Sequence, residues 1–526
     1  MVSFFCLILH GHLPFVRHSE IPECLEENWF FEAVTEVYLP LLGSFRRLQD
    51  EKVDFRLGFS LSPTLTAMMD DPLLKSRYRL HLENLIRLSE SEKRRTAGSP
   101  ELNRLAAMYE ERFLLCRRLW KDLFQEDLIA AFRDLHASGN LELITTAATH
   151  GFLPLMENSP EAMRAQVEIG CRSFENFFGE RPRGFWLPEC GYVPALDKIL
   201  ARAGVRYTML ETHGLLHADP TPSFGPYALA RSPEGIVLFG RDPEAAHQVW
   251  SRTEGYPGDP WYRDFYRDIG FDLEQEYLKP FLYHGGQRMA TGIKYHRITG
   301  STDRKELYDP AAAAGRVQEH ARDFLSKRRH QAERLSGLME RPPVIAAMYD
   351  AELFGHWWFE GPAWLEQVFR KAQAEGDRFT PAAPSDLIEK LPPEETVSPQ
   401  LSTWGLKGYN EMWLQPANTS MYRHLELASR RMKDLARRTP DAHGITERAL
   451  NQALRELLLA QASDWAFLLA AGTAVAYAAR RWKLHIARFN QLEEMLRNAQ
   501  EIDDAWLSSL EEQDNPFPFV DYKLYR

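Results

Sequence analysis

Short apolar runs alternate with longer amphipathic stretches through the first two thirds of the chain. Residues 2–9 form a continuous apolar run of strand length, which is typical of a strand buried on both faces of a parallel sheet. Further strand candidates lie at residues 54–60, 141–146, 183–187, 207–210, 236–239 and 344–349. Segments with helical periodicity separate them, at residues 26–50, 161–178, 196–203 and 311–339. This alternation predicts an α/β fold built around a parallel sheet.

Two stretches depart from the alternation. Residues 71–136 are charged and helical in period throughout, without a strand candidate, so we expect a helical segment inserted between strands. Residues 211–279 are rich in proline, glycine and aromatic residues and have no strong period. Long loops in compact domains are most often functional, which favours a lid or loop excursion over a linker.

The pattern changes after a proline-rich stretch at residues 381–399. Beyond it, segments of helical periodicity at 420–437, 446–477 and 480–499 dominate. We therefore expect two domains, an α/β domain over residues 1–398 and an all-helical domain over residues 399–526.

Polar side chains recur just after the carboxyl ends of the predicted strands. These residues are His10, His12, His150, Glu189, Glu211 and His213. Because parallel strands end at one edge of a sheet or barrel, and ligands bind at that edge, we expect the candidate site there.

Two carboxylates at this edge are candidates for catalysis. Glu189 follows a buried strand among Trp186, Pro188 and Tyr192, where partial desolvation is common for reactive carboxylates; a solvated loop glutamate fits this pattern equally well. Asp350 ends the strand at 344–349, and the alternative for it is a helix N-cap. Two carboxylates facing one cleft are what cleavage of a glycosidic bond requires.

The histidines allow several interpretations. His10, His12, His150 and Asp350 could ligate a metal, as in barrels that hydrolyse amide or ester bonds. Gly11, between His10 and His12, and Pro14 after them make a turn plausible at this point of the chain. The same histidines could instead bind sugar hydroxyls, orient a carboxylate, or be satisfied structural residues.

Composition narrows the class of partner. The chain has 526 residues, a formal net charge of −11, 13 Trp and 19 Tyr. The negative balance argues against nucleic acid, and the surplus of aromatic rings suits stacking against sugars. Five scattered cysteines favour a reducing compartment. The apolar N-terminal run is too short to cross a bilayer and has no basic residues before it, so we expect a cytoplasmic protein with no membrane partner. Separately, we expect a monomer.

Five motifs in order carry a resemblance to a known family. They are HGHLP at residues 10–14, THG at 149–151, WLPECGY at 186–192, YDAELFGHWW at 349–358 and WGLKGYNEMW at 404–413. Together they span nearly the whole chain, which resembles glycoside hydrolase family 57 and, within it, the 1,4-α-glucan branching enzymes.

The resemblance implies an incomplete (β/α)7 barrel whose cleft is completed by the helical C-terminal domain. It implies Glu189 as the nucleophile and Asp350 as the general acid and base. The residues that it places at the substrate are His10, His12, His150, Arg267, Trp357, Trp404, Trp413 and Asp464. The implied reaction cuts an α-1,4-glucan and transfers the released chain to a 6-hydroxyl, with no metal and no organic cofactor.

Three other functions stay open. A hydrolase or a 4-α-glucanotransferase of the same family would share the first half of the reaction, and a polysaccharide deacetylase would use the histidines and Asp350 to hold a metal. A fourth, a non-catalytic glucan-binding relative, is disfavoured by the presence of both carboxylates.

Two departures from the branching subgroup concern acceptor and substrate binding. Branching members carry a tyrosine near the tip of a loop after the nucleophile strand, whereas here Tyr227 and Tyr256 flank that region with no tyrosine between them. Ile21 stands where relatives often have an aromatic residue. The first departure leaves the balance between transfer and hydrolysis open.

Overall fold

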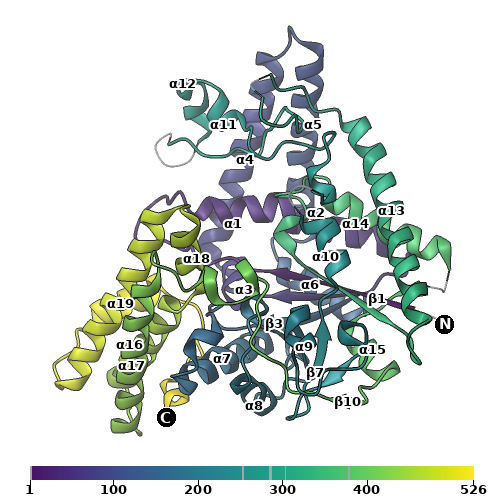
Figure 1. Ribbon diagram of the computed structural model, residues 1–526. Helices are drawn as coiled ribbons and strands as arrows, with labels where there is room; N and C mark the ends of the chain where they lie inside the picture. Colours follow the sequence, from purple (N-terminus) through teal and green to yellow (C-terminus); the bar gives the residue numbers. More distant parts are fainter. Residues whose placement is uncertain (1–2, 252–253, 283–286, 303, 377–378) are drawn as a thin grey trace.

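The computed structural model describes residues 3–251, 254–282, 287–302, 304–376 and 379–526, and its core is a curled parallel sheet (Figure 1). In these ranges seven parallel strands follow the order β8-β1-β2-β3-β4-β5-β7. Their bounds are β8 Val344–Asp350, β1 Ser3–Gly11, β2 Leu57–Leu61, β3 Leu141–Thr146, β4 Gly184–Trp186, β5 Tyr207–Leu210 and β7 Val237–Gly240.

The barrel does not close by a full ladder. Among the described residues, β7 approaches β8 through an isolated bridge between Arg241 and Ala346. Three short strands are added to the sheet, β6 (Ala230–Arg231), β9 (Phe379–Pro381) and β10 (Glu395–Thr396). The expected incomplete (β/α)7 barrel is confirmed.

The apolar run at the N-terminus forms the central strand. All nine residues of β1 are buried, and Val2 lies outside the described residues. Phe5, Leu7 and Leu9 belong to the core that packs against the outer helices. Cys6 and Ile8 belong to a second cluster with residues of β3, β4, β5 and β7. A strand buried on both faces needs apolar residues without alternation, and that is the observed pattern.

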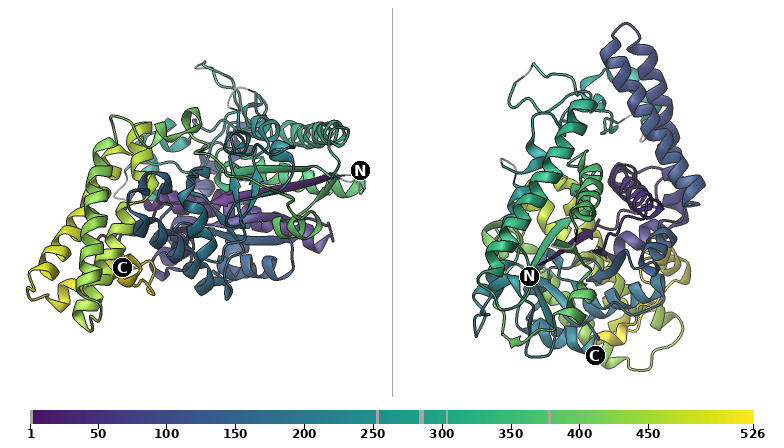
Figure 2. Two further views of the ribbon diagram at one scale, coloured as in Figure 1. Left: turned by 60° about the horizontal axis from the view of Figure 1, so that its bottom comes forward. Right: turned by 90° about the vertical axis from the view of Figure 1, so that its right-hand side faces the viewer.

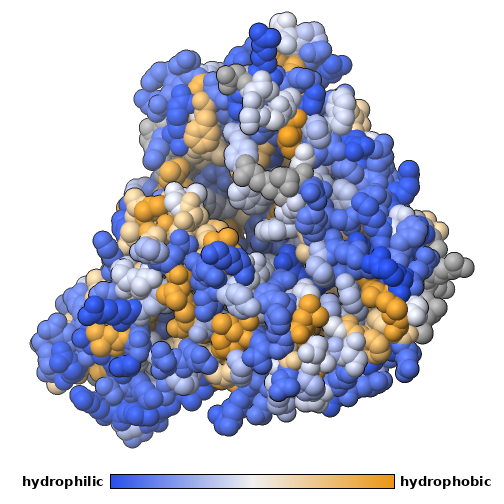
Figure 3. Space-filling view, in the orientation of Figure 1, coloured by the Kyte–Doolittle hydropathy of each residue, from blue (hydrophilic) through white to orange (hydrophobic). Residues whose placement is uncertain are grey.

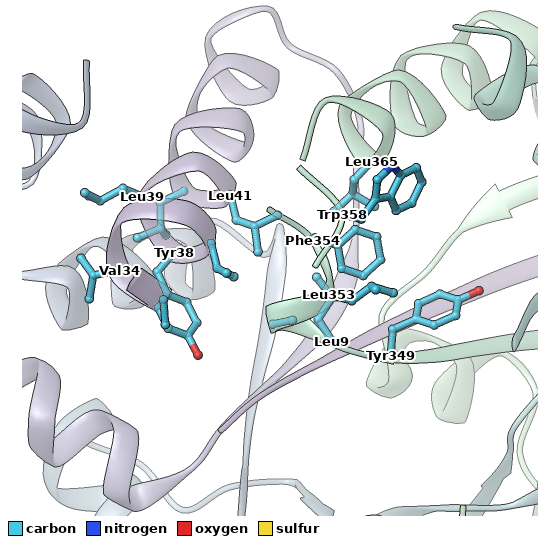
Figure 4. Close-up of a cluster of buried hydrophobic side chains, with 14 of the residues drawn as sticks. Leu9, Val34, Tyr38, Leu39, Leu41, Tyr349, Leu353, Phe354, Trp358 and Leu365 are labelled. Carbon is cyan, nitrogen blue, oxygen red and sulfur yellow. The ribbon is translucent and has the colours of Figure 1, made fainter. Parts of the chain in front are cut away.

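Five outer helices lie close to their predicted positions: α1 (Glu27–Ala33), α2 (Leu39–Asp50), α7 (Pro160–Phe178), α8 (Ala195–Arg202) and α13 (Pro310–Ser336). Three others have no counterpart among the expected helical segments: α3 (Pro63–Asp70), α14 (Gly361–Glu375) and α15 (Pro384–Lys390), which lies in the proline-rich stretch 381–399. A π-helical segment, Val34–Tyr38, interrupts the helix expected at 26–50. Such insertions are frequent at functional sites, and this one carries Tyr38, whose hydroxyl donates to Glu352. Figure 4 shows apolar side chains of this segment in one cluster with β1 and the segment after β8.

The segment expected to be a helical insertion forms an arm. Helices α4 (Pro72–Arg95) and α5 (Pro100–Arg117) pack on each other and project from the body (Figures 1 and 2). A π-helical segment (Arg118–Leu123) and α6 (Leu128–Ala137) lead back to β3.

The structure divides the stretch 211–279 into two parts. Its first part supplies α9 (Thr212–Leu216), the barrel strand β7 and α10 (Pro243–Trp250); residues 252 and 253 lie outside the described ranges. Its second part holds α11 (Ile269–Asp272) and α12 (Gln275–Leu278). These short helices lie beside the arm, where the Tyr277 hydroxyl donates to Glu92 of α4.

Five helices form the C-terminal bundle. They are α16 (Thr419–Arg438), α17 (Ile445–Ala460), α18 (Ser463–Ala471), α19 (Val475–Arg497) and α20 (Asp504–Gln513). The single helix expected at 446–477 is therefore wrong, because Ala462 is extended and bridges Gly151 of the barrel. The Ser463 N–H then donates to the carbonyl of His150, so contacts with the barrel override local helical periodicity.

Two further findings concern composition. All five cysteines are buried and unpaired, as their scattered positions predicted. Within the described ranges, none of the helices combines the length and the apolar composition that crossing a bilayer requires.

Candidate active site

A cleft of about 500 Å³ opens at the carboxyl ends of the barrel strands. Both the barrel and the C-terminal region supply its walls. The predicted residues that line it are His10, His12, His150, Glu189, Asp350, Trp357, Trp404, Trp413 and Asp464. Figure 3 shows the face hollowed between the arm and the body, with apolar side chains gathered beside the hollow over the C-terminal helices. The structure therefore brings four of the six strand-end residues and Asp350 into one cleft, together with four of the residues that the resemblance placed at the substrate.

Glu189 lies where β4 gives way to a short 3₁₀ turn. Its backbone is left-handed, with φ of 61°, a strained conformation for a glutamate that is typical of functional positions. The Trp404 indole N–H donates to its Oε2 over 2.7 Å, and its side chain is 21% exposed. Burial raises the pKa of Glu189 to about 7, the Trp404 hydrogen bond opposes this, and the Asp464 charge adds to it. The alternative of a solvated loop glutamate does not fit this setting.

Asp350 ends β8, opposite His10 in the register of β1. Burial raises the pKa of Asp350 well above its usual value, and the charges of Glu352 and Glu189 raise it further, against the opposing charge of Arg241. The 3₁₀ helix that follows (Ala351–Leu353) has no side-chain hydrogen bond at its N-terminus in the described structure, which removes the N-cap alternative. A protonated carboxyl group at neutral pH is a suitable general acid.

The three histidines form a stacked, hydrogen-bonded cluster, which we call the histidine stack: His10, His12 and His150. The His12 and His150 rings lie 3.9 Å apart, and Nε2 of His10 lies 3.0 Å from Nε2 of His150. Their other ring nitrogens bond to Ser60, Ser62, Ser463 and Asp464. Burial lowers the pKa of His10 and of His150.

His12 differs from the other two histidines of the stack. Burial acts to lower its pKa, but the Asp464 carboxylate, 3.1 Å from its Nε2, overcomes burial and holds the pKa of His12 above its usual value. Asp464 lies in the first turn of α18, which two residues, Gln461 and Ala462, separate from the end of α17.

The donor atoms of the histidine stack face protein partners rather than a common point. Among the described residues, the side chains close enough together to hold a metal ion are Glu456, His485 and Asp514, inside the C-terminal bundle. There the cations Arg481 and Arg488 pair with Asp514, so the group is a buried charge network. The predicted metal set of His10, His12, His150 and Asp350 is not assembled as a metal-binding group.

An aromatic wall, which we define as Trp250, Trp357 and Trp404, faces the carboxylates. Trp357 is 51% exposed and stacks on Phe265 at 4.1 Å between ring centres. Trp250 is 48% exposed, and its ring lies nearly parallel to that of Trp404, at 6.4 Å and 17°. Exposed, nearly parallel indoles are suited to stacking on the apolar faces of sugar rings.

Two residues expected at the substrate are placed differently. Trp413 lines the cleft but is 1% exposed, because its ring stacks on Phe152 at 4.2 Å. Arg267 does not line the cleft, and its Nε donates to Asp272 at 3.0 Å. Substrate contact through either residue stays a prediction.

Glu211 and His213, from the same predicted edge, bind neighbouring protein groups. Glu211 accepts from Arg241 at 3.0 Å, and Nε2 of His213 lies 2.7 Å from the carbonyl oxygen of Gly408. They hold Arg241 and the 404–413 segment in place.

Among the cleft residues that sequence reasoning missed, three bear on the chemistry or on stacking: Glu352, Arg241 and Trp250. Glu352 accepts from the backbone N–H of His12 at 3.0 Å, and burial raises its pKa to about 7. Arg241 lies over the Trp404 ring at 5.1 Å, and Trp250 belongs to the aromatic wall. The position of Glu352, two residues after Asp350, could have predicted that it lies in the cleft. No local sequence pattern predicts the same for Trp250, which lies at the end of α10.

The flanking tyrosines of the acceptor region lie outside the cleft. The Tyr227 hydroxyl accepts from Gln331, and the Tyr256 hydroxyl donates to Asp323 at 2.7 Å. Among the described residues that line the cleft, none is a tyrosine. Ile21 is 40% exposed and also lies outside the lining. The stretch between the two tyrosines contributes Arg241 and Trp250 instead.

Two carboxyl groups in a cleft lined by indole rings, at the carboxyl ends of a barrel, are typical of a glycosidase, and the family comparisons agree. The model of glycosyl hydrolase family 57 matches residues 6–400, and that of the C-terminal part of 1,4-alpha-glucan branching enzymes matches residues 424–525. The chain therefore belongs to glycoside hydrolase family 57.

The chain is similar both to proteins described as branching enzymes and to one described as an alpha-amylase. The 1,4-alpha-glucan branching enzyme TK1436 of Thermococcus kodakarensis is 33% identical over 98% of this chain and 78% of its own. The crystal structure of a GH57-type branching enzyme from Pyrococcus horikoshii matches with TM-score 0.89 and 31% identity, covering 100% of this chain and 97% of its own. The crystal structure of AmyC from Thermotoga maritima, described as a novel alpha-amylase, matches with TM-score 0.93 and 42% identity, over 100% and 99%.

Proposed function

We propose that this protein is a 1,4-α-glucan branching enzyme that works by retaining double displacement. The observation that carries the proposal is the placement, in one cleft, of two carboxyl groups, Glu189 and Asp350, whose pKa values burial raises. A carboxyl group that keeps its proton in this way can act as a general acid, and a second carboxyl group beside it can act as the nucleophile. The branching-enzyme relatives and the branching-enzyme C-terminal model support the same reaction.

The first half of the reaction forms a covalent intermediate. Asp350, protonated, donates its proton to the glycosidic oxygen of the bound α-1,4-glucan, while Glu189 attacks the anomeric carbon from the opposite side. The Trp404 hydrogen bond fixes the Glu189 carboxylate for this attack. The leaving chain departs as a neutral alcohol, and Asp350 becomes a carboxylate.

The second half decides the product. Asp350 now takes the proton from the 6-hydroxyl of another glucan chain, and that oxygen displaces Glu189 to form an α-1,6 bond. Exclusion of water and stacking of the acceptor favour transfer over hydrolysis. The aromatic wall supplies the stacking surface, and Arg241 beside it provides hydrogen-bond donors.

The proposal extends to the setting of the enzyme. An enzyme of this kind acts on amylose, glycogen and similar polymers, and we place it in the synthesis of storage glucan in the cytoplasm. The predicted monomeric state and the two-domain division at residue 398 belong to the same proposal.

The test is incubation with amylose, followed by the iodine complex and by new reducing ends before and after isoamylase. We expect iodine absorbance to fall with few new reducing ends, and isoamylase then to release short chains. Glu189→Gln serves as the inactive control. Reducing ends that rise from the start, with nothing added by isoamylase, would show that water is the acceptor.

A second candidate is an α-glucan hydrolase on the same frame. Two observations favour it: none of the described residues lining the cleft is a tyrosine, and the similar AmyC structure is described as an alpha-amylase. A 4-α-glucanotransferase would give a third outcome, redistributed linear chains with neither new reducing ends nor isoamylase-sensitive bonds. Metal analysis of active protein tests the deacetylase alternative, which a stoichiometric, tightly bound zinc would support.

A further inference from the structure

A second cavity, of about 190 Å³, lies in the seam between the barrel and the C-terminal bundle. The segment after β3 forms one side of it, with Phe152 and Ser159, and α16 forms the other, with Tyr422, Leu425 and Ser429. The described residues that line it include none of those that line the catalytic cleft. It is a separate cavity.

The two cavities lie on opposite sides of one thin wall. Ser463 lines the seam cavity and the next residue, Asp464, lines the cleft; Leu414 and Trp413 are divided in the same way. Phe152 of the seam cavity stacks on Trp413 at 4.2 Å, and the Ser463 hydroxyl lies 3.0 Å from Nδ1 of His150. A ligand in the seam cavity would therefore touch the back of the catalytic wall.

The lining combines rings and methyl groups with hydroxyl and carboxylate oxygens. Phe152 and Leu425 provide apolar surface, whereas Ser159, Ser429 and Glu426 provide polar groups. Apolar cavities stay empty, but polar ones of this size hold water or a polar ligand. Burial raises the pKa of the Tyr422 hydroxyl above its usual value, so it stays a neutral group that can donate and accept.

Charge and size select the class of ligand. Among the described residues that line the cavity there is no lysine or arginine, and Glu426 pairs with Arg430, which does not line it, so phosphorylated sugars and nucleotides are disfavoured. The volume is below the roughly 300–1,000 Å³ of pockets that take drug-sized ligands, which leaves room for a ring rather than a long chain. A neutral hexose, with apolar faces and an equatorial rim of hydroxyls, fits both properties of the lining.

We propose that the seam cavity is an accessory glucan-binding site that holds a glucosyl unit of an α-1,4-glucan outside the catalytic cleft. The proposal rests on the proposed function for its substrate class alone, and it holds equally for a branching enzyme and a hydrolase. A polymer held at a second point is presented to the cleft at a high effective concentration. A short oligosaccharide that occupies the cleft alone gains nothing from this site.

Two matched variants on α16 test the proposal. Leu425→Trp fills the cavity, and Leu427→Trp places the same side chain on the same helix at a position that is 47% exposed and outside the lining. We expect Leu425→Trp to raise the KM for long amylose about two- to tenfold, the effect of losing one ring-stacking contact of roughly 0.5–1.5 kcal/mol. The kcat and the activity on short maltooligosaccharides should match those of Leu427→Trp. Equal KM values for amylose in the two variants would overturn the proposal.

A binding assay with a catalytically inactive variant tests the accessory site independently of the reaction that the enzyme catalyses. In the Glu189→Gln background, native electrophoresis through a glycogen-containing gel measures polymer binding, and Leu425→Trp should be retarded less than Leu427→Trp. If Leu425→Trp fails to fold, Tyr422→Ala replaces it, with Leu427→Ala as its control. Equal retardation within the pair contradicts the accessory site even if the enzyme branches. A difference supports the site even if the amylose assay shows hydrolysis.

Discussion

The carboxylate end and the aromatic wall of the cleft are built in opposite ways. At the carboxylate end (Glu189, Asp350, Glu352 and the histidine stack) the side chains are buried or partly buried, and hydrogen bonds of 2.7–3.0 Å hold Glu189, Glu352 and the histidines. At the aromatic wall, Trp250 and Trp357 are half exposed. This difference indicates that strand ends hold the reacting groups in fixed positions. The acceptor sugar, in contrast, binds by stacking on exposed indole rings, which requires no strict geometry.

The largest effect is expected from removing either carboxylate. Asp350→Asn should lower kcat on amylose about 10²–10⁴-fold, the usual contribution of a general acid and base, and Glu189→Gln should lower it at least as much. Both variants should unfold at a temperature no lower than the parent, because Glu189→Gln removes a partly desolvated charge and Asp350→Asn replaces a neutral carboxyl group with a neutral amide of the same size. Steady-state kinetics and thermal unfolding check this. Retention of more than a tenth of the activity in either variant would refute its role.

The next effect concerns the proton on Asp350. The Glu352 charge raises the pKa of Asp350, so Glu352→Gln should lower that pKa, and Asp350 should then lose its proton at lower pH. We expect the alkaline limb of the kcat profile to move toward acid, with a modest loss at neutral pH. Glu352→Asp, which keeps the charge, is the control. An alkaline limb that stays in place would exclude electrostatic coupling between the two groups.

The acid limb of the kcat–pH profile should show the effect of the Asp464 charge on Glu189. Burial raises the pKa of Glu189 to about 7, and the Asp464 charge contributes to that rise. Asp464→Asn should therefore lower the pKa of Glu189, so that the nucleophile stays ionised to lower pH and the acid limb of kcat moves in that direction. The pH profile measures this directly. Movement of the acid limb to higher pH would contradict the assigned sign.

The smallest effect is expected at the aromatic wall. Trp250→Ala should leave donor cleavage within a few fold but raise the proportion of hydrolysis, because the acceptor loses one stacking surface of about 1 kcal/mol. Trp250→Tyr should keep most of the transfer. The ratio of new reducing ends to isoamylase-released chains gives the result. An unchanged ratio in Trp250→Ala would mean that acceptor choice lies elsewhere in the cleft.

Much of the fold could be predicted because it depends on local patterns. The strand at residues 141–146 is observed at those positions, and the helix predicted at 161–178 begins one residue earlier. Continuous apolar runs and helical periodicity are properties of short windows. The break between α17 and α18 could not be predicted in this way, since it depends on the bridge between Ala462 and Gly151, more than 300 residues away in sequence.

The candidate site was predictable where strand ends mark it. His10, His150, Glu189 and Asp350 each follow a predicted strand, and the structure brings them into one cleft. Trp250 and Arg241 reach that cleft only through the path of α10 and the end of β7, which no local pattern reveals. Arg267 is a different case, since a motif resemblance placed it at the substrate, its side chain pairs with Asp272 outside the cleft lining, and its contact with substrate stays a prediction.

The most direct test of the central claim is to trap the glycosyl-enzyme intermediate. The protein would be incubated with a fluorinated α-glucosyl fluoride, which forms the intermediate faster than it breaks down, and then digested and analysed by mass spectrometry. The account predicts a single added glycosyl group on the peptide that contains Glu189, and none on the Glu189→Gln protein. A label on another carboxylate, or turnover of the reagent without any label, would contradict double displacement at Glu189.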